Sequence, residues 1–315
     1  MGERNHTQFT GFILLGFSDI EDVRILLFIF FLSMLLMSLI GNMLIIVAVQ
    51  HHSGFHTPMY FFITVLSFLE LWYVMITGPK LLSLLLTKDN RISCEWCFAQ
   101  LYMFHSLGIT EGTLLAIMAL DRFMAICNPL RYISIMNERM CSFLAILCWT
   151  VGFLLATIPT TLTIKVPLCG PYQIDHYFCD LSPLLALACK DISVTVMINR
   201  CVIGFAIMFN FTFILVMYLN IIVSILKLGS NTGKKKAFST CSSHLTVVVM
   251  IYSTTFAVYG SPKGAEYVNY DKLFSLVYTV LAPLLNPIIF SLRNNDIKMA
   301  LKGIVQRKWA NIRLP

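Results

Sequence analysis

The sequence has little charge. Only 12% of its 315 residues are Asp, Glu, Lys or Arg, whereas about a quarter of an ordinary soluble domain is charged. Hydrophobic residues make up 57%, so most of the chain must face lipid or other apolar segments. The apolar residues form continuous runs and do not alternate with polar ones, which excludes a membrane β-barrel and favours a bundle of helices.

Motifs of several other membrane-protein classes are also missing. There is no His-Glu-x-x-His pattern for a metalloenzyme, and residues 274–292 contain no lysine that could bind retinal. A transporter or channel would need repeated halves or several acids along a polar path, and the sequence has neither. No linker divides the chain, so we expect one domain over residues 1–315.

Seven apolar runs reach the length of roughly 20 residues that a membrane-spanning helix needs. They cover residues 25–49, 58–86, 97–127, 140–162, 193–226, 237–260 and 273–292. The predicted fold is therefore an all-α membrane protein, a seven-transmembrane helix bundle at 25–292 between an extracellular N-terminus (1–24) and a cytoplasmic tail (293–315). The first 20 residues do not look like a cleavable signal, so the first run should be an uncleaved anchor.

Basic residues set the expected orientation. Lysines at 234–236 and the basic residues of the tail lie beside membrane ends, and such residues stay on the cytoplasmic side. The net charge of +7 then faces anionic inner-leaflet lipid and does not suggest a nucleic-acid partner. In the tail, a helical spacing of apolar residues predicts a short amphipathic helix on the membrane surface, with Ile297, Ala300, Leu301 and Ile304 on one face.

The predicted outer segments contain a sequon and several cysteines. Asn5 begins an Asn-x-Thr glycosylation site. The cysteines lie before the third run and in the long loop at 163–192, at Cys94, Cys97, Cys169, Cys179 and Cys189. Disulfides persist outside the cell, so these residues can form bridges that staple the loop as a lid. Their number is odd, so one thiol is left over, and the sequence alone leaves the pairing open.

Six motifs, in order and at matching spacing, carry a family resemblance. They are GN at 41–42, FHTPMYFF at 55–62, LSFLE at 66–70, MALDRFMAIC with NPLRY at 118–132, KAFSTCSSHL at 236–245 and PLLNPIIFSLRN at 283–294. The chain resembles a vertebrate odorant receptor of the tetrapod-type subgroup, in the rhodopsin-like class of G-protein-coupled receptors. Tyrosines are usual in that family where Leu120, Phe123 and Phe290 stand here.

The resemblance implies a switch at the inner membrane boundary. Arg122 would alternate between Asp121 and a G protein, although an ion pair there could simply satisfy two charges. Two further elements are implied, and each has a simpler explanation: side-chain packing for the first and an ordinary proline kink for the second. They are an inner polar cluster of Tyr218 and His244 with Arg122, and a hinge at Asn286 and Pro287.

Glu70 and Glu111 are the acids near the bilayer midplane, where a charge costs roughly 2.5–3.5 kcal/mol on insertion scales. Both should face the bundle interior. They could share a proton and help the helices pack, or bind a cation. The resemblance implies a sodium site here, with Ser67, Asn42 and Asn286 as further oxygen donors. No other cofactor is indicated.

The resemblance also implies a ligand pocket between the outer halves of the third, fifth, sixth and seventh spans. Its residues would be Phe104, His105, Gly108, Ile109, Val202, Ala206, Tyr252, Thr255, Tyr259 and Thr279. Such a set is mostly apolar with a few polar groups, as small-molecule sites are, although core packing explains Val202 and Ala206 equally well. Residues 98–110 contain no Asp or Glu that would bind an amine, so a neutral ligand is expected.

The resemblance further pairs Cys97 with Cys179 and Cys169 with Cys189, which leaves Cys94 free. It implies a receptor, not an enzyme, in the plasma membrane of olfactory sensory cilia. A small volatile odorant would bind in the pocket, and the receptor would then activate a heterotrimeric, olfactory-type stimulatory G protein and raise cyclic AMP.

Overall fold

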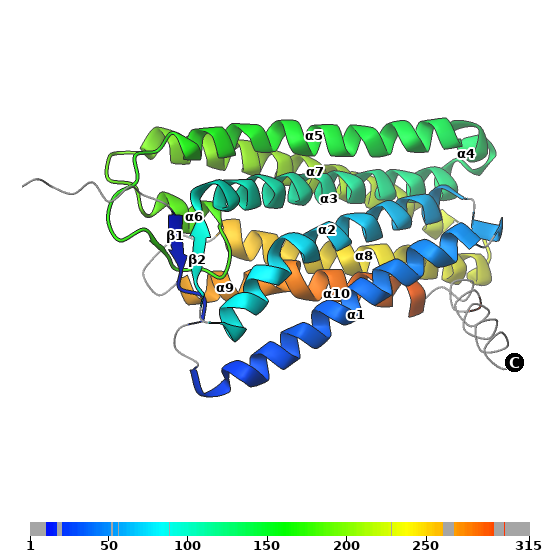
Figure 1. The fold of residues 1–315 in the computed structure, drawn as a ribbon. Helices are drawn as coiled ribbons and strands as arrows, with labels where there is room; N and C mark the ends of the chain where they lie inside the picture. Colours follow the sequence, from blue (N-terminus) through cyan, green and yellow to red (C-terminus); the bar gives the residue numbers. More distant parts are fainter. Residues whose placement is uncertain are drawn as a thin grey trace, which may run out of the picture.

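The computed structural model describes residues 11–17, 21–51, 53–55, 57–87, 89–227, 229–260, 268–292 and 299. Seven helical stretches in it are long and apolar enough to cross a membrane, which confirms the predicted bundle. They are α1 (Arg24–His51), α2 (Pro58–Leu86), α3 (Cys94–Cys127), α5 (Glu138–Ile164), α7 (Ser193–Lys227), α8 (Asn231–Gly260) and a composite seventh helix. The last consists of α9 (Val268–Leu276), the π-helix η4 (Val277–Leu281) and α10 (Ala282–Leu292). Figure 1 shows these helices side by side along one long axis.

The helices begin where the local sequence can satisfy or replace free backbone N–H groups. Pro58 stands in the first turn of α2, where its missing N–H is no loss. The side chain of Ser93 accepts a hydrogen bond from the backbone N–H of Trp96 at the start of α3. Asn137 does the same for Met140 at the start of α5, at 3.0 Å.

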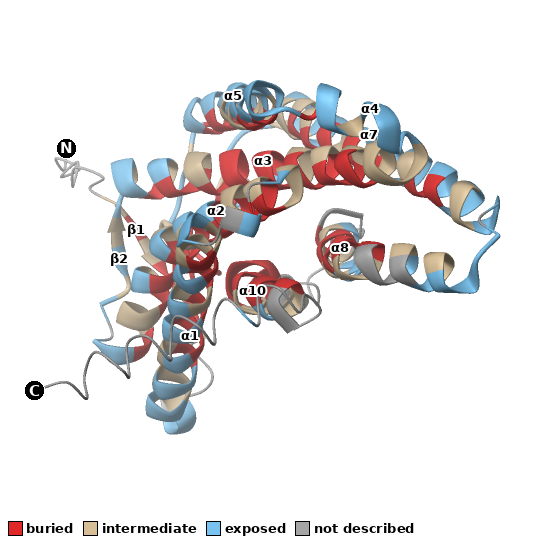
Figure 2. Cartoon of the chain, turned by 90° about the vertical axis from the view of Figure 1, so that its right-hand side faces the viewer, coloured by how far each residue is buried: buried red, intermediate tan, exposed pale blue. Residues whose placement is uncertain are grey.

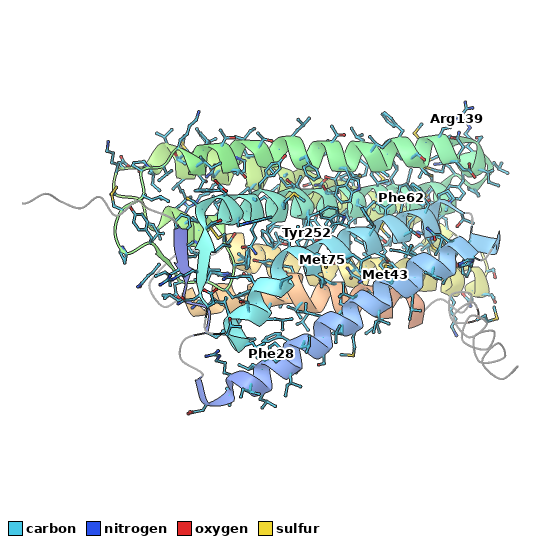
Figure 3. The ribbon with its side chains drawn as sticks, viewed as in Figure 1. Phe28, Met43, Phe62, Met75, Arg139 and Tyr252 are labelled. Carbon is cyan, nitrogen blue, oxygen red and sulfur yellow. A yellow bond between two sulfur atoms is a disulfide. The ribbon has the colours of Figure 1, made fainter. Side chains whose placement is uncertain are left out.

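Helix α3 lies at the centre of the bundle. Within its most apolar stretch 67% of the residues are buried, against 28% in α1, α5 and α7. Figure 2 shows the buried residues turned toward the interior and the exposed ones turned outward. The outward residues are largely apolar; Met43 on α1 and Met75 on α2 are 51% and 62% exposed (Figure 3). Such surfaces fit contact with lipid tails.

The inner connections are short. Helix α4 (Pro129–Ile135) follows α3 directly after Asn128. Helix α8 begins at Asn231, so the basic residues at 234–236 form its first turns. The lysines there are good helix formers, and they extend α8 beyond its apolar part.

A small sheet caps the outer end, which the all-α prediction did not include. The strand β1 (Gly11–Leu14) lies between β2 (Arg91–Ser93), to which it is antiparallel, and β3 (Gln173–Ile174), to which it is parallel. Phe12 and Leu14 point into the core. A Cβ at Gly11 would lie 2.3 Å from the carbonyl oxygen of Ile92, so only glycine permits this pairing.

The long outer loop is folded. It contains β3 and the short helix α6 (Leu181–Leu185). Disulfides join Cys97 of α3 to Cys179 and Cys169 to Cys189, and Cys94 is a free thiol. The first bridge ties the loop to the central helix, directly above the bundle interior.

The predicted hinge at Asn286 and Pro287 lies inside α10. A proline lacks the N–H that would bond to the carbonyl four residues earlier, here that of Pro283. The side-chain amide of Asn42 on α1 donates to that carbonyl at 2.8 Å. Asn42 therefore satisfies the acceptor that Pro287 leaves open and joins the first span to the seventh. The predicted amphipathic helix of the tail lies outside the described residues.

Candidate functional site: a buried cavity and an inner polar switch

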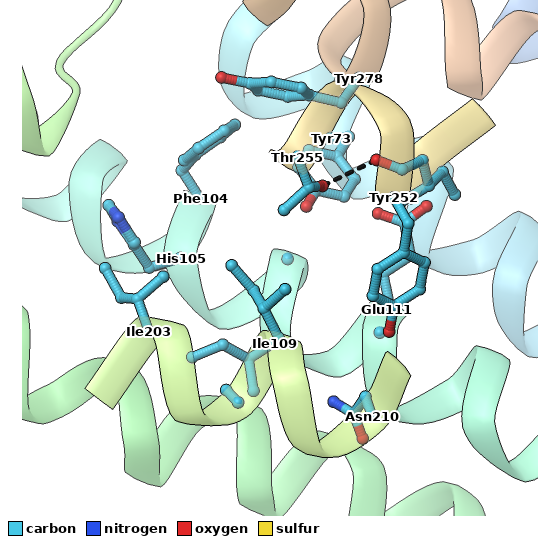
Figure 4. A pocket seen from close by; sticks show the side chains of 15 residues that line it. Tyr73, Phe104, His105, Ile109, Glu111, Ile203, Asn210, Tyr252, Thr255 and Tyr278 are labelled. Carbon is cyan, nitrogen blue, oxygen red and sulfur yellow. Dashed lines mark hydrogen bonds between the residues drawn. The ribbon is translucent and has the colours of Figure 1, made fainter. Parts of the chain in front are cut away.

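A cavity of about 100 Å³ lies inside the bundle, between α3, α7 and α8. Its walls are mostly apolar, and Tyr73 of α2 and Tyr278 of η4 close its remaining sides. It is lined by Tyr73, Phe104, His105, Gly108, Ile109, Glu111, Gly112, Ile203, Ala206, Ile207, Asn210, Ile251, Tyr252, Thr255 and Tyr278. Figure 4 shows Phe104, His105 and Ile203 at one end and Glu111, Tyr252 and Asn210 at the other.

Two glycines on α3 open its inward face to the cavity. A Cβ at Gly108 would lie 3.2 Å from the hydroxyl of Tyr73. At Gly112, one turn further on, it would lie 3.4 Å from the amide nitrogen of Asn210 and 3.6 Å from the hydroxyl of Tyr252. The space beside α3 therefore depends on the absence of these two side chains.

Most of the predicted ligand-binding residues lie around this cavity, namely Phe104, His105, Gly108, Ile109, Ala206, Tyr252 and Thr255. Val202 does not line it; the next residue, Ile203, does, and it shares a face of α7 with Ala206. Thr279 does not line it either. It bonds instead to Tyr177 of the outer loop at 2.8 Å and to the carbonyl of Ser275. The side chain of Tyr259 lies outside the described residues.

Several lining residues were not predicted as such. Glu111 was expected only as part of an ion site, yet it forms part of the cavity wall. Tyr73, Ile207, Asn210 and Tyr278 were missed altogether. Gly108 is followed three and four residues later by Glu111 and Gly112 on the same helix. Residues three or four apart share a face, so this spacing could have predicted that Glu111 lines the cavity.

A second polar group lies deeper, between α2, α3 and α10. The amide of Asn286 donates to one carboxylate oxygen of the buried Glu70. The other oxygen of Glu70, one oxygen of Glu111 and the side-chain oxygens of Asn42 and Asn286 are buried and have no hydrogen-bond partner. Among the described residues no three His, Cys, Asp or Glu side chains group around a metal position. The unpaired oxygens are nevertheless suitable donors for a hard cation.

At the inner end of α3, Arg122 forms an ion pair with Asp121 at 2.9 Å. The hydroxyl of Tyr132, on α4, donates to the same carboxylate at 2.7 Å. Burial, with the neighbouring Asp121 next, raises the pKa of Tyr132 well above its ordinary value, so it stays a donor. Both members of the ion pair are buried, so separating them needs a new partner for each charge.

Tyr218 and His244 form the other half of the predicted inner cluster. Nε2 of His244 lies 3.1 Å from the carbonyl oxygen of Leu115 on α3 and must donate to it, because a carbonyl only accepts. Nδ1 then accepts from the Tyr218 hydroxyl at 2.7 Å. The pair links α3, α7 and α8. Arg122 makes its ion pair with Asp121 and not with this pair.

The outer loop closes over the bundle through buried polar contacts. Lys272 of α9 bonds to Asp175 and to the carbonyl of Gly16. His176 is buried and lies 3.3 Å from the hydroxyl of Ser275. Burial lowers the pKa of His176 to about 4, and the nearby Lys272 adds to this effect against Asp180 and Asp175. The predicted glycosylation site at Asn5 lies outside the described residues.

Comparison with known proteins matches these features to one family. The family model described as "Olfactory receptor" matches residues 31–308. Olfactory receptor 6Y1 of Homo sapiens is 46% identical over 301 residues, which is 96% of this chain and 93% of that protein. Olfactory receptor 1M1 of Mus musculus is 44% identical and olfactory receptor 6N1 of Homo sapiens 43% identical, each over 98% of both chains. The chain belongs to the olfactory receptor family and is a multi-pass membrane receptor, not an enzyme.

Proposed function

We propose that this receptor binds small, mostly neutral volatile molecules in the cavity between α3, α7 and α8, and that the bound state activates a stimulatory olfactory-type G protein and raises cyclic AMP. The cavity carries this proposal. It is enclosed by isoleucine, alanine and aromatic side chains with a few polar atoms, the character of a small-molecule site. Its small volume suits molecules near the size of a single ring or a short chain.

Activation requires that the ligand bind one conformation better than another. The cavity and the inner switch share α3 and α8. His105 and Arg122 lie on α3, and Tyr252 and His244 lie on α8. A ligand that changes the spacing of α3 and α8 at the cavity would therefore act on the bond between His244 and the Leu115 carbonyl as well. Arg122 and the basic residues of α8 would then meet the G protein at the inner face.

We further propose a sodium ion between Glu70 and Glu111, held with the help of Asn42, Ser67 and Asn286. All five side chains lie in the bundle, and the unpaired oxygens of Glu70, Glu111, Asn42 and Asn286 support the assignment. The ion would offset the negative charge of two buried carboxylates. Replacing sodium with N-methylglucamine in the medium should shift odorant potency in the parent receptor and leave the Glu111→Gln variant insensitive to the exchange.

The chain would act in the plasma membrane of olfactory sensory cilia, with its N-terminus outside. The outer position of both disulfides, which require an oxidising compartment, supports this orientation. The inner position of the lysines at 234–236 supports it too.

A cyclic AMP assay tests the main proposal. Cells that express the receptor with the olfactory stimulatory G protein are exposed to a panel of neutral volatiles. A dose-dependent rise that a Gly112→Leu variant abolishes at equal surface expression is expected, because the new side chain fills the space beside Asn210 and Tyr252. Gly204→Leu is the matched control, since nothing lies within 4 Å of a Cβ there. A response that survives Gly112→Leu unchanged would contradict binding in this cavity.

A further inference from the structure

The hydrogen-bonding state of His105 defines what its free nitrogen can bind. Nδ1 lies 2.9 Å from the carbonyl oxygen of Leu101, and a carbonyl oxygen only accepts. Nδ1 therefore carries the hydrogen. Nε2 is buried and has no partner. The neutral ring in this tautomer has no hydrogen on Nε2. Nε2 is thus a free lone pair, an acceptor.

Other polar groups of the cavity also make hydrogen bonds within the protein. The Thr255 hydroxyl donates to the carbonyl of Ile251 at 2.8 Å, drawn as the dashed line in Figure 4. The Tyr73 hydroxyl bonds to the carboxyl group of Glu111, one oxygen of which has no partner. The Thr255 hydroxyl can therefore only accept from a ligand, as Nε2 of His105 can. These two acceptors come from different helices, α8 and α3, so the character is a property of the assembled cavity.

Tyr252 has a free hydroxyl in the cavity wall. Its oxygen is buried without a hydrogen-bond partner, so it can donate or accept. A ligand with a hydroxyl group can donate its one hydrogen to Nε2 of His105 at one end of the cavity, or accept from Tyr252 at the other end. A ketone, aldehyde, ester or ether can only accept, from donors such as Tyr252 and the second N–H of Asn210, and it faces the lone pairs of His105 and Thr255 with lone pairs of its own.

We infer that the cavity selects small molecules that carry a hydrogen-bond donor, alcohols and phenols in particular, over the carbonyl compounds and ethers of the same skeleton, and that His105 Nε2 is the main acceptor. This inference rests on the proposed function, since it names the class of odorant bound at that site. A site built to pair with a hydroxyl rejects the analogue that lacks it, because its own buried polar group is then left unpaired.

The first test uses the unmodified receptor. A secondary alcohol, its ketone and its methyl ether are compared for each chain length from four to eight carbons. Binding is measured as ligand-induced thermal stabilisation of the purified receptor, and signalling as cyclic AMP in cells. The alcohol should stabilise and activate at a concentration at least tenfold lower than the ketone or the ether. Equal or better potency of the ketone in both assays would overturn the inference.

The second test assigns the acceptor. His105→Phe keeps a flat ring and removes the lone pair, so alcohols should lose at least tenfold in potency while ketones change by less than threefold. Gly204→Ala on α7 adds a methyl group in open space and should leave both classes unchanged. Alcohol preference that persists in a folded His105→Phe receptor would overturn the role of His105.

The two assays separate this inference from the proposed function. Alcohol-selective stabilisation without cyclic AMP would uphold the selectivity and contradict the G-protein proposal. Cyclic AMP responses of equal strength to alcohols and ketones would uphold the receptor and overturn the selectivity. Neither stabilisation nor cyclic AMP for any compound of the series would contradict both.

Discussion

The hydroxyl of Tyr218 lies 2.7 Å from Nδ1 of His244, and the two rings are nearly parallel at 14°. This contact joins α7 to α8 near their inner ends, while Nε2 of the same histidine holds the Leu115 carbonyl of α3. Three helices are thus connected through one imidazole. Any rearrangement that moves α8 away from α3 has to break the hydrogen bond between His244 and the Leu115 carbonyl.

Tyr218→Phe should reduce the stability of the purified receptor by about 1–3 kcal/mol, because Nδ1 of His244 is left buried and unpaired. Thermal unfolding in detergent measures this loss. A double-mutant cycle with His244→Phe isolates the contact, since the second change should cost less once the tyrosine hydroxyl is gone. Strictly additive losses would contradict the pairing.

Arg122→Ala should abolish the cyclic AMP response at matched surface expression. The substitution removes the cation that the G protein would meet and leaves Asp121 buried with only the Tyr132 hydroxyl as partner. Arg139→Ala is the control, because Arg139 is an exposed cation at the start of α5. Equal responses of the two variants would contradict a special role for Arg122.

Cys97→Ser and Cys179→Ser should each reduce stability by about 2–5 kcal/mol, the usual cost of removing a native disulfide, and should lower surface expression to a similar degree. The double variant should be no worse than either single one, since the bridge is already lost. Cys94→Ser should change little, because Cys94 is a free thiol in the same turn of α3. Surface labelling of an N-terminal tag provides the comparison.

Acid should weaken the outer cap through His176. Its pKa in the folded protein is about 4, below the ordinary value near 6.5, so the unfolded chain binds a proton more readily. The contribution of this residue is therefore complete above about pH 6.5 and is lost as the pH falls toward 4. Between pH 7.5 and 5 the loss should be about 2 kcal/mol.

Thermal unfolding over this pH range tests the prediction, with His176→Gln as the comparison. The glutamine variant should be less stable than the parent at pH 7.5 and should show a flatter pH profile, since it cannot take up the proton. The same slope in both proteins would assign the acid sensitivity to other groups.

At the cavity, the prediction and the structure agree on α3 and α8 and differ at one position of α7. The sequence indicated which segments of α3 and α8 face the interior, and residues such as Phe104, Gly108 and Tyr252 lie there. On α7 it indicated Ala206 but not Ile203, which takes the place expected for Val202. Adjacent residues on a helix differ by about 100° in direction, and both are β-branched and apolar, so only the packing against neighbouring helices distinguishes them.

The sequence by itself determined that seven helices cross the membrane, because a hydrophobic run of sufficient length is a local property and lipid leaves the backbone few alternatives. Only the tertiary structure decided that Gly11–Leu14 pairs between Arg91–Ser93 and Gln173–Ile174, that Asn42 bonds to the Pro283 carbonyl, and that Glu111 borders the cavity. Each of these joins segments distant in sequence, and such contacts depend on how whole helices and loops pack together, which no local pattern of residues encodes.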